Sequence, residues 1–194
     1  MLEPESLSAI RIAFDLFIGR RTALGRLDMS VDGFWHSFRA MLYVMPFFAI
    51  SAAVEHGMLL ADSIAGTVSD SAFILARVVD YGIDWMAMPV LLAAFAGPLG
   101  ITRTYAGYVV VRNWALVVMS APSALVALLL GFGVLSFEAS AALSLLILAV
   151  MIQFHYRIVR WTFGKTAGFA IGLVAADVAL SLVLSAVIDR LFGL

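Results

Sequence analysis

One carboxylate stands out because of its place in the sequence. Asp177 falls near the middle of the last long apolar stretch, Ala167 to Ile188. A charge at that depth in a bilayer costs on the order of a few kcal/mol. Ser181 and Ser185 follow at four-residue spacing, which places them on the same helix face. The pattern fits either a neutral, hydrogen-bonded acid that fixes helix packing or a site for a proton or cation.

Small residues recur on the same stretch and just before it. Gly164, Gly168 and Gly172 are spaced by four, and Ala176 continues the series. Such a face lets another helix approach closely. The neighbour is either another helix of this chain or a second copy of it, so both packing within the bundle and a homodimer seam stay open.

The composition predicts a membrane protein. Of 194 residues, 63% are hydrophobic and 13% are charged, against about 25% charged in soluble domains. A net charge of -1 and a single lysine make nucleic acid an unexpected partner. The absence of cysteine excludes disulfides and thiolate ligands for a metal.

Catalytic chemistry is not expected. His36, His56 and His155 lie near the ends of apolar stretches. His56 is expected on the opposite side of the membrane from the other two, so the three cannot bind one metal. No nucleophile motif accompanies them. We therefore predict no enzyme activity, no catalytic residue, no metal and no cofactor.

The apolar stretches predict an all-α, polytopic membrane protein with a bundle of five transmembrane helices. We expect spans at about 36–54, 82–101, 114–135, 139–154 and 167–188, each near the roughly 20 residues that cross a bilayer. Residues 1–33 form an N-terminal segment whose residues 6–19 have the spacing of an amphipathic, interfacial helix, and residues 34–194 form the transmembrane domain. The stretch 55–81 has no clear pattern beyond a short external helix near 73–79.

Basic residues are distributed unequally between the two sides of these spans. Arg77 and Arg190 fall on one side, and the other side carries ten: Arg11, Arg20, Arg21, Arg26, Arg39, Arg103, Arg112, Arg157, Arg160 and Lys165. Since basic loops stay in the cytoplasm, we predict a bacterial inner (plasma) membrane protein with a cytoplasmic N-terminus and a periplasmic C-terminus.

Counting residues from the cytoplasmic end of each predicted span shows which residues of the other spans lie at the same depth as Asp177. That level holds prolines and serines and, by this count, no lysine, arginine or histidine. An acid without a cation is expected to be protonated and to donate a hydrogen bond, either to a carbonyl freed by a proline or to a side chain. The candidate polar site is Asp177, Ser181, Ser144, Ser123 and Tyr43.

Two segments carry a resemblance. Residues 27–38, Leu-Asp-Met-Ser-Val-Asp-Gly-Phe-Trp-His-Ser-Phe, and residues 108–114, Tyr-Val-Val-Val-Arg-Asn-Trp, resemble a group of small inner-membrane proteins of alphaproteobacteria that are sometimes labelled transporters. Five spans in this orientation also resemble the Yip1 architecture, which implies a role in membrane organisation. The chain lacks the Asp-Leu-Tyr-Gly-Pro motif of the eukaryotic family, and Ala106-Gly107-Tyr108 echoes its Gly-Tyr element only weakly. Partnership with small GTPases therefore does not carry over.

We predict a non-enzymatic integral inner-membrane protein with a membrane-organising or interaction role of Yip1-like type. Its expected partners are the lipid bilayer and a second copy or another membrane protein. The alternative is a small transporter or channel subunit with a midplane proton or cation site at Asp177, and an accessory subunit of a larger complex is a third. A polar cavity that reaches Asp177 would favour the transporter, whereas a sealed site would favour packing.

Overall fold

The computed structural model describes residues 3–61 and 69–194, and within these ranges the chain is all-helical. Five segments are long and apolar enough to cross a membrane, which confirms the predicted five-span integral membrane protein. The elements in chain order are α1 (Pro4–Phe17), the 3-10 helix η1 (Arg21–Arg26), α2 (Val31–Ser37), α3 (Ala40–Ala61), α4 (Asp70–Phe95), α5 (Tyr105–Gly131), α6 (Phe137–Phe163) and α7 (Ala167–Phe192). The first span combines α2 and α3.

Short polar residues set where several helices begin. The side chains of Ser30, Ser69, Ser136 and Thr166 each accept a hydrogen bond from the backbone N–H three residues later, which satisfies a donor that the first turn leaves free. Gly164 ends α6 with a φ of 63°, a left-handed conformation that glycine adopts without strain.

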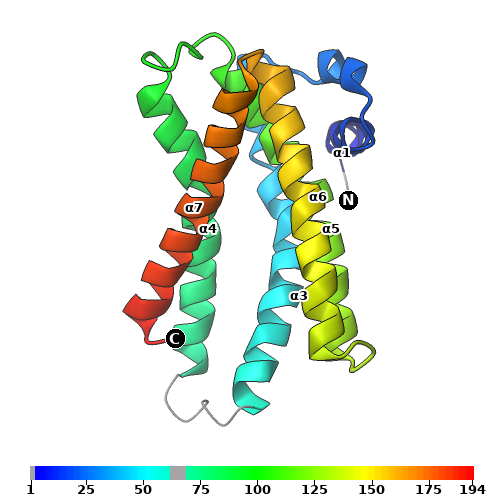
Figure 1. The fold of residues 1–194 in the computed structure, drawn as a ribbon, viewed down its shortest axis with the longest axis vertical. Coiled ribbons are helices and arrows are strands. Elements are labelled where there is room, and N and C mark those ends of the chain that lie inside the picture. Colours follow the sequence, from blue (N-terminus) through cyan, green and yellow to red (C-terminus); the bar gives the residue numbers. More distant parts are fainter. Residues whose placement is uncertain (1–2, 62–68) are drawn as a thin grey trace.

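The long helices run up and down, and α1 lies across them, seen end-on in Figure 1. We call the end that carries α1, η1 and the connections 96–104 and 164–166 the upper end, and the end that carries the C-terminus and the connection 132–136 the lower end. Helices α3, α5 and α6 form one group, and α4 packs with α7. Contacts between α6 and α7 join the two groups.

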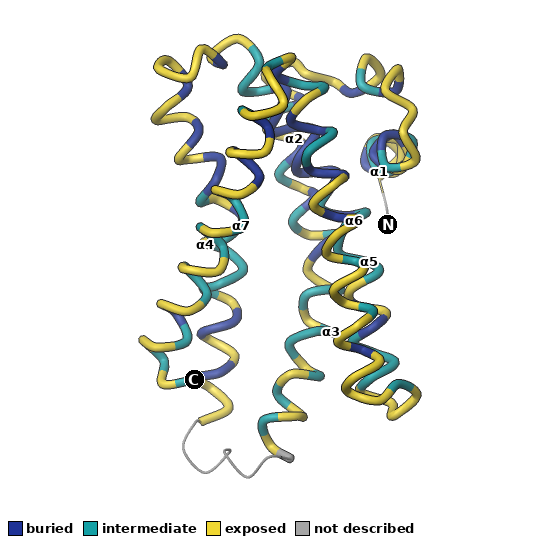
Figure 2. Tube along the Cα trace, viewed as in Figure 1, coloured by how far each residue is buried: buried dark blue, intermediate teal, exposed yellow. Residues whose placement is uncertain are grey.

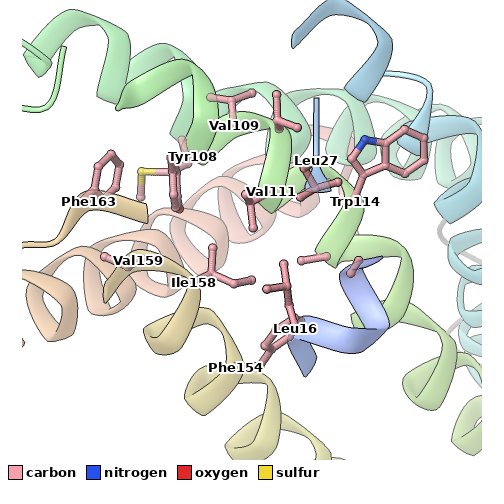
Figure 3. Packing of buried hydrophobic residues seen from close by; sticks show 14 of the residues in the cluster. Leu16, Leu27, Tyr108, Val109, Val111, Trp114, Phe154, Ile158, Val159 and Phe163 are labelled. Carbon is pink, nitrogen blue, oxygen red and sulfur yellow. The ribbon is translucent and has the colours of Figure 1, made fainter. Parts of the chain in front are cut away.

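Buried residues concentrate toward the upper end (Figure 2). There α1 packs against the bundle, with Leu16 beside Phe154 of α6 and close to Val111 of α5 (Figure 3). The rings of Phe17 and Phe154 meet edge to face with centroids 5.2 Å apart. The predicted N-terminal helix is therefore present and packs on the bundle through part of its apolar surface, while Leu7, Phe14 and Ile18 stay exposed.

Helices α3, α4, α5 and α6 each extend beyond the span predicted from hydropathy. Helix α3 continues to Ala61 and α4 begins at Asp70, so much of the stretch 55–81 is helical, and residues 62–68 of that stretch lie outside the described residues. Helix α5 begins at Tyr105 instead of 114, and α6 continues to Phe163 instead of ending at 154. Hydropathy ended these spans at charged residues, but the helices continue past them, and two of these charged side chains, Arg77 and Arg112, are buried against protein.

Candidate functional site

Asp177 lies beside two basic residues. Its Oδ1 is 3.8 Å from Nη2 of Arg112, and its Oδ2 is 3.4 Å from Nδ1 of His155. All three side chains are largely buried, with 17%, 6% and 10% of their surface exposed, respectively. The prediction that Asp177 lacks a cationic partner is therefore wrong, and with it fails the argument that the acid must be protonated.

The longer helices explain the error. Arg112 lies seven residues inside α5, His155 lies eight residues before the end of α6, and Asp177 lies ten residues inside α7. At 1.5 Å per residue these depths are about 10, 12 and 15 Å from the upper helix ends. The sequence-based spans placed Arg112 in a connection and His155 just past the end of a span, so neither was counted at the depth of the acid.

Arg112 also contacts a backbone carbonyl that a proline has freed. Its Nη1 donates to the carbonyl oxygen of Trp85, 3.4 Å away. Trp85 is four residues before Pro89, which lies inside α4 and has no N–H to offer that carbonyl. A proline-freed carbonyl does act as an acceptor, as the sequence suggested, but it is on α4 and its donor is Arg112.

The second ring nitrogen of His155, Nε2, contacts a tyrosine. Tyr108 is fully buried on α5, and its hydroxyl oxygen lies 2.9 Å from Nε2 of His155. The ring of Tyr108 stacks on Phe163 with centroids 4.7 Å apart. Tyr108, His155, Asp177 and Arg112 thus form one connected cluster, which we call the Asp177 cluster.

A cleft of about 320 Å³ reaches this cluster between α4, α5, α6 and α7. Its polar lining consists of Asp84, Arg112, His155, Asp177 and Ser181. Its remaining walls are apolar, with Leu116, Met119, Met151 and Leu182 among them. The acid is therefore partly open to a cavity larger than one water molecule.

Polar residues continue from the cleft toward the lower end. On α7, Ser185 and Asp189 extend the four-residue spacing of Asp177 and Ser181. On α4, Asp80 lies one turn below Asp84 and accepts a hydrogen bond of 3.5 Å from the Ser185 hydroxyl. A polar stripe shared by α4 and α7 thus leads away from the cluster through otherwise apolar helices.

An arginine closes the lower end of this stripe. Nη2 of Arg77 lies 2.9 Å from Oε1 of Glu55 and 2.9 Å from Oδ1 of Asp189, and its Nη1 lies 3.8 Å from Oδ2 of Asp80. Only 10% of the Arg77 side chain is exposed. One guanidinium therefore ties α3, α4 and α7 together.

The structure brings together only some of the predicted site residues. Asp177 and Ser181 share the cleft. Ser144 and Ser123 are exposed on α6 and α5, and Tyr43 packs against Trp114 with ring centroids 6.2 Å apart. A depth similar to that of Asp177 did not predict contact with it, because the sequence of a nearly uniformly apolar helix gives little indication of which face packs against which neighbour.

The predicted helix-packing face is not closely packed within the described chain. Gly164 caps α6 and precedes α7, and Gly168, Gly172 and Ala176 are exposed. A Cβ atom added at Gly168 or Gly172 would meet no atom within 4 Å. The expected close approach of another helix of this chain fails because these residues border an open groove facing α4.

The Asp177 cluster has the parts for proton exchange. An imidazole can accept a proton at one ring nitrogen and release one from the other, and those of His155 face Asp177 and Tyr108. The guanidinium of Arg112 keeps its proton and supplies a fixed positive charge beside the carboxylate.

Comparison with protein-family models, curated proteins and solved structures gave no match.

Proposed function

We propose that this integral membrane protein is a small transporter or channel subunit that carries protons through the Asp177 cluster. The observation that carries the proposal is the polar cleft of about 320 Å³ that ends on Asp177, His155 and Arg112. Ionisable residues inside spans are costly and are typical of ion pathways and proton relays.

The polar stripe supports a route between the cleft and the lower end. Carboxylates of Asp84 and Asp80 and hydroxyls of Ser181 and Ser185 follow one another at helical spacing. In this proposal a proton passes along these groups and any water between them to Asp177. His155 accepts it from Asp177 at Nδ1 and releases a proton from Nε2 to the Tyr108 hydroxyl, which passes its own proton on toward the upper end of α5. Arg112 balances the charge of the carboxylate.

The exposed apolar residues of the long helices do not favour a membrane-organising role over transport. Any spanning bundle presents such residues to lipid tails, so they are required in both cases. A Yip1-like organising role, the absence of enzyme activity and the cytoplasmic position of the N-terminus remain predictions from the sequence.

Proton flux into proteoliposomes tests the proposal directly. Purified protein is reconstituted with a trapped pH-sensitive dye, and a potassium diffusion potential drives proton entry. We expect the parent protein to exceed empty liposomes and Asp177→Asn, which keeps the side-chain shape, to fall to the empty-liposome rate. Glu138→Gln is the matched control, because Glu138 is exposed at the start of α6 and lies outside the cleft lining.

Two results would refute the proposal. One is a parent protein that carries no more protons than empty liposomes. The other is an Asp177→Asn variant that elutes as the parent does in size-exclusion chromatography and conducts at the parent rate.

A further inference from the structure

A second cavity, of about 540 Å³, lies at the upper ends of the spans and is basic. It is lined by Gly100, Thr102, Arg103, Thr104, Gly164 and Lys165, and none of its described lining residues is acidic. Neither cation forms an ion pair among the described residues. The cavity therefore presents uncompensated positive charge at the upper ends of the helices that can span a membrane.

A glycine lets the lysine occupy this position. Gly100 has a φ of 62°, and a Cβ added there would lie 3.2 Å from Nζ of Lys165. The Lys165 carbonyl in turn accepts a hydrogen bond from Arg160 at the end of α6. The ammonium group of Lys165 therefore lies beside Gly100, in the connection between α4 and α5.

An apolar groove of about 370 Å³ lies next to the basic cavity. It runs between the upper half of α4 and the first turns of α7 and is lined by Leu91, Phe95, Leu99, Gly168, Gly172 and Ala176, among others. Helix α4 leans away from α7 toward this end (Figure 1). Because the glycines have no side chains, the groove remains open along α7.

The apolar groove and the basic cavity are neighbours both at the end of α4 and at the start of α7. Leu99 of the groove precedes Gly100 of the cavity, and Gly168 of the groove follows Lys165 of the cavity by one turn. We propose that an anionic phospholipid binds here, with its headgroup at Arg103 and Lys165 and one acyl chain along Gly168 and Gly172.

Charge distinguishes this site from the cavity beneath α1. That cavity, of about 360 Å³, contains Arg26 and Arg39, but Arg26 pairs with Asp15 at 2.9 Å and Arg39 pairs with Glu3. Asp28 also lines it, and hydrogen bonds from Ser30 lower the pKa of that carboxyl. The arginines of the cavity beneath α1 are therefore already paired with acids of this chain, whereas the cations of the basic cavity have no acidic partner among the described residues.

The same features favour a lipid over a second copy of α7. A helix packed on the glycine face would fill the groove but leave Arg103 and Lys165 without a counter-charge. An anionic lipid can fill the groove with an acyl chain and pair with both cations through its headgroup. Basic pockets between spans are typical headgroup sites.

Native mass spectrometry of the full chain in detergent tests the site. The protein is titrated with phosphatidylglycerol, with zwitterionic phosphatidylcholine and with inorganic phosphate. We expect one phosphatidylglycerol per chain, bound more tightly than phosphatidylcholine. Since each cation near the surface contributes about fivefold, Arg103→Gln with Lys165→Gln should weaken binding about 25-fold. Arg21→Gln with Arg190→Gln removes two exposed positive charges elsewhere and should leave binding unchanged.

A second variant separates the lipid from its alternatives. Gly172→Leu fills the groove without touching the cations and should also weaken phosphatidylglycerol binding while the chain stays folded. Phosphate that binds as tightly as the lipid would show a free-anion site and overturn the proposal. A Gly172→Leu variant that loses an oligomer but keeps its lipid affinity would do the same, because the groove would then be a seam between copies.

Discussion

Nδ1 of His155 on α6 lies 3.4 Å from Oδ2 of Asp177 on α7. The two helices are joined by the short connection 164–166, so α7 returns beside α6 and brings its mid-span carboxylate to the buried imidazole. Since Nε2 of the same ring meets the Tyr108 hydroxyl, His155 lies between a tyrosine that is fully buried and an acid that borders the cleft.

His155→Gln should abolish most proton flux. Glutamine can form hydrogen bonds in this position, but it cannot take a proton at one atom and release it from another. Positioned acid–base groups typically contribute at least about a hundredfold, so we expect the initial rate in proteoliposomes to fall by about that factor. His56→Gln is the control, because His56 pairs with Asp70 outside the cluster. A His155→Gln rate within twofold of the parent would contradict a relay through the imidazole.

Arg112 and Asp177 should be energetically coupled. Arg112→Gln leaves a partly buried carboxylate with one basic neighbour fewer, and we expect it to lower the free energy of unfolding by about 3 kcal/mol. Combining it with Asp177→Asn should cost about 1–2 kcal/mol less than the sum of the single changes. Reversible unfolding in mixed detergent micelles measures this cycle. A cycle of Arg112→Gln with Glu138→Gln should be additive, and additivity in the first cycle would refute the coupling.

The fold was largely predictable because its signals are local. Apolar stretches between polar connections predict spans, and residues such as Ser136 and Thr166 at their starts act as caps. The errors arose where charge lies inside a helix. Because of Arg77 and Arg112, hydropathy began the spans of α4 and α5 too late, since hydropathy takes no account of a partner on another helix.

The site was predictable in part. Asp177 and Ser181 were identified because a polar stripe on an apolar helix is visible in one segment. Arg112 and His155 were missed because their meeting with the acid depends on where α5 and α6 end and on which faces they turn inward. Two signals could have helped: Pro89 leaves the Trp85 carbonyl free for a donor, and a basic residue close to a predicted span end can lie inside a longer helix.

Water access to the cleft is testable because the chain has no cysteine of its own. Ser181→Cys places a thiol in the cleft lining, and Ser144→Cys places one on the exposed face of α6, which meets lipid tails in a spanning helix. Thiol reagents attack the thiolate, which forms in water and not in hydrocarbon. We expect a water-soluble methanethiosulfonate to label Ser181→Cys at least about ten times faster. Equal rates at both positions would show that the cleft is dry.

Arg77 should control access from the lower end. Removing its charge in Arg77→Gln leaves Glu55, Asp80 and Asp189 facing one another without the cation that joins their helices. We expect a loss of about 2 kcal/mol in stability, since the partners are partly exposed and the pair is screened. We also expect thiol labelling of Ser185→Cys to be several times faster in this background. Arg190→Gln, an exposed change next to Asp189, should alter neither quantity. If Arg77→Gln leaves both the unfolding free energy and the labelling rate unchanged, Arg77 does not hold α3, α4 and α7 together.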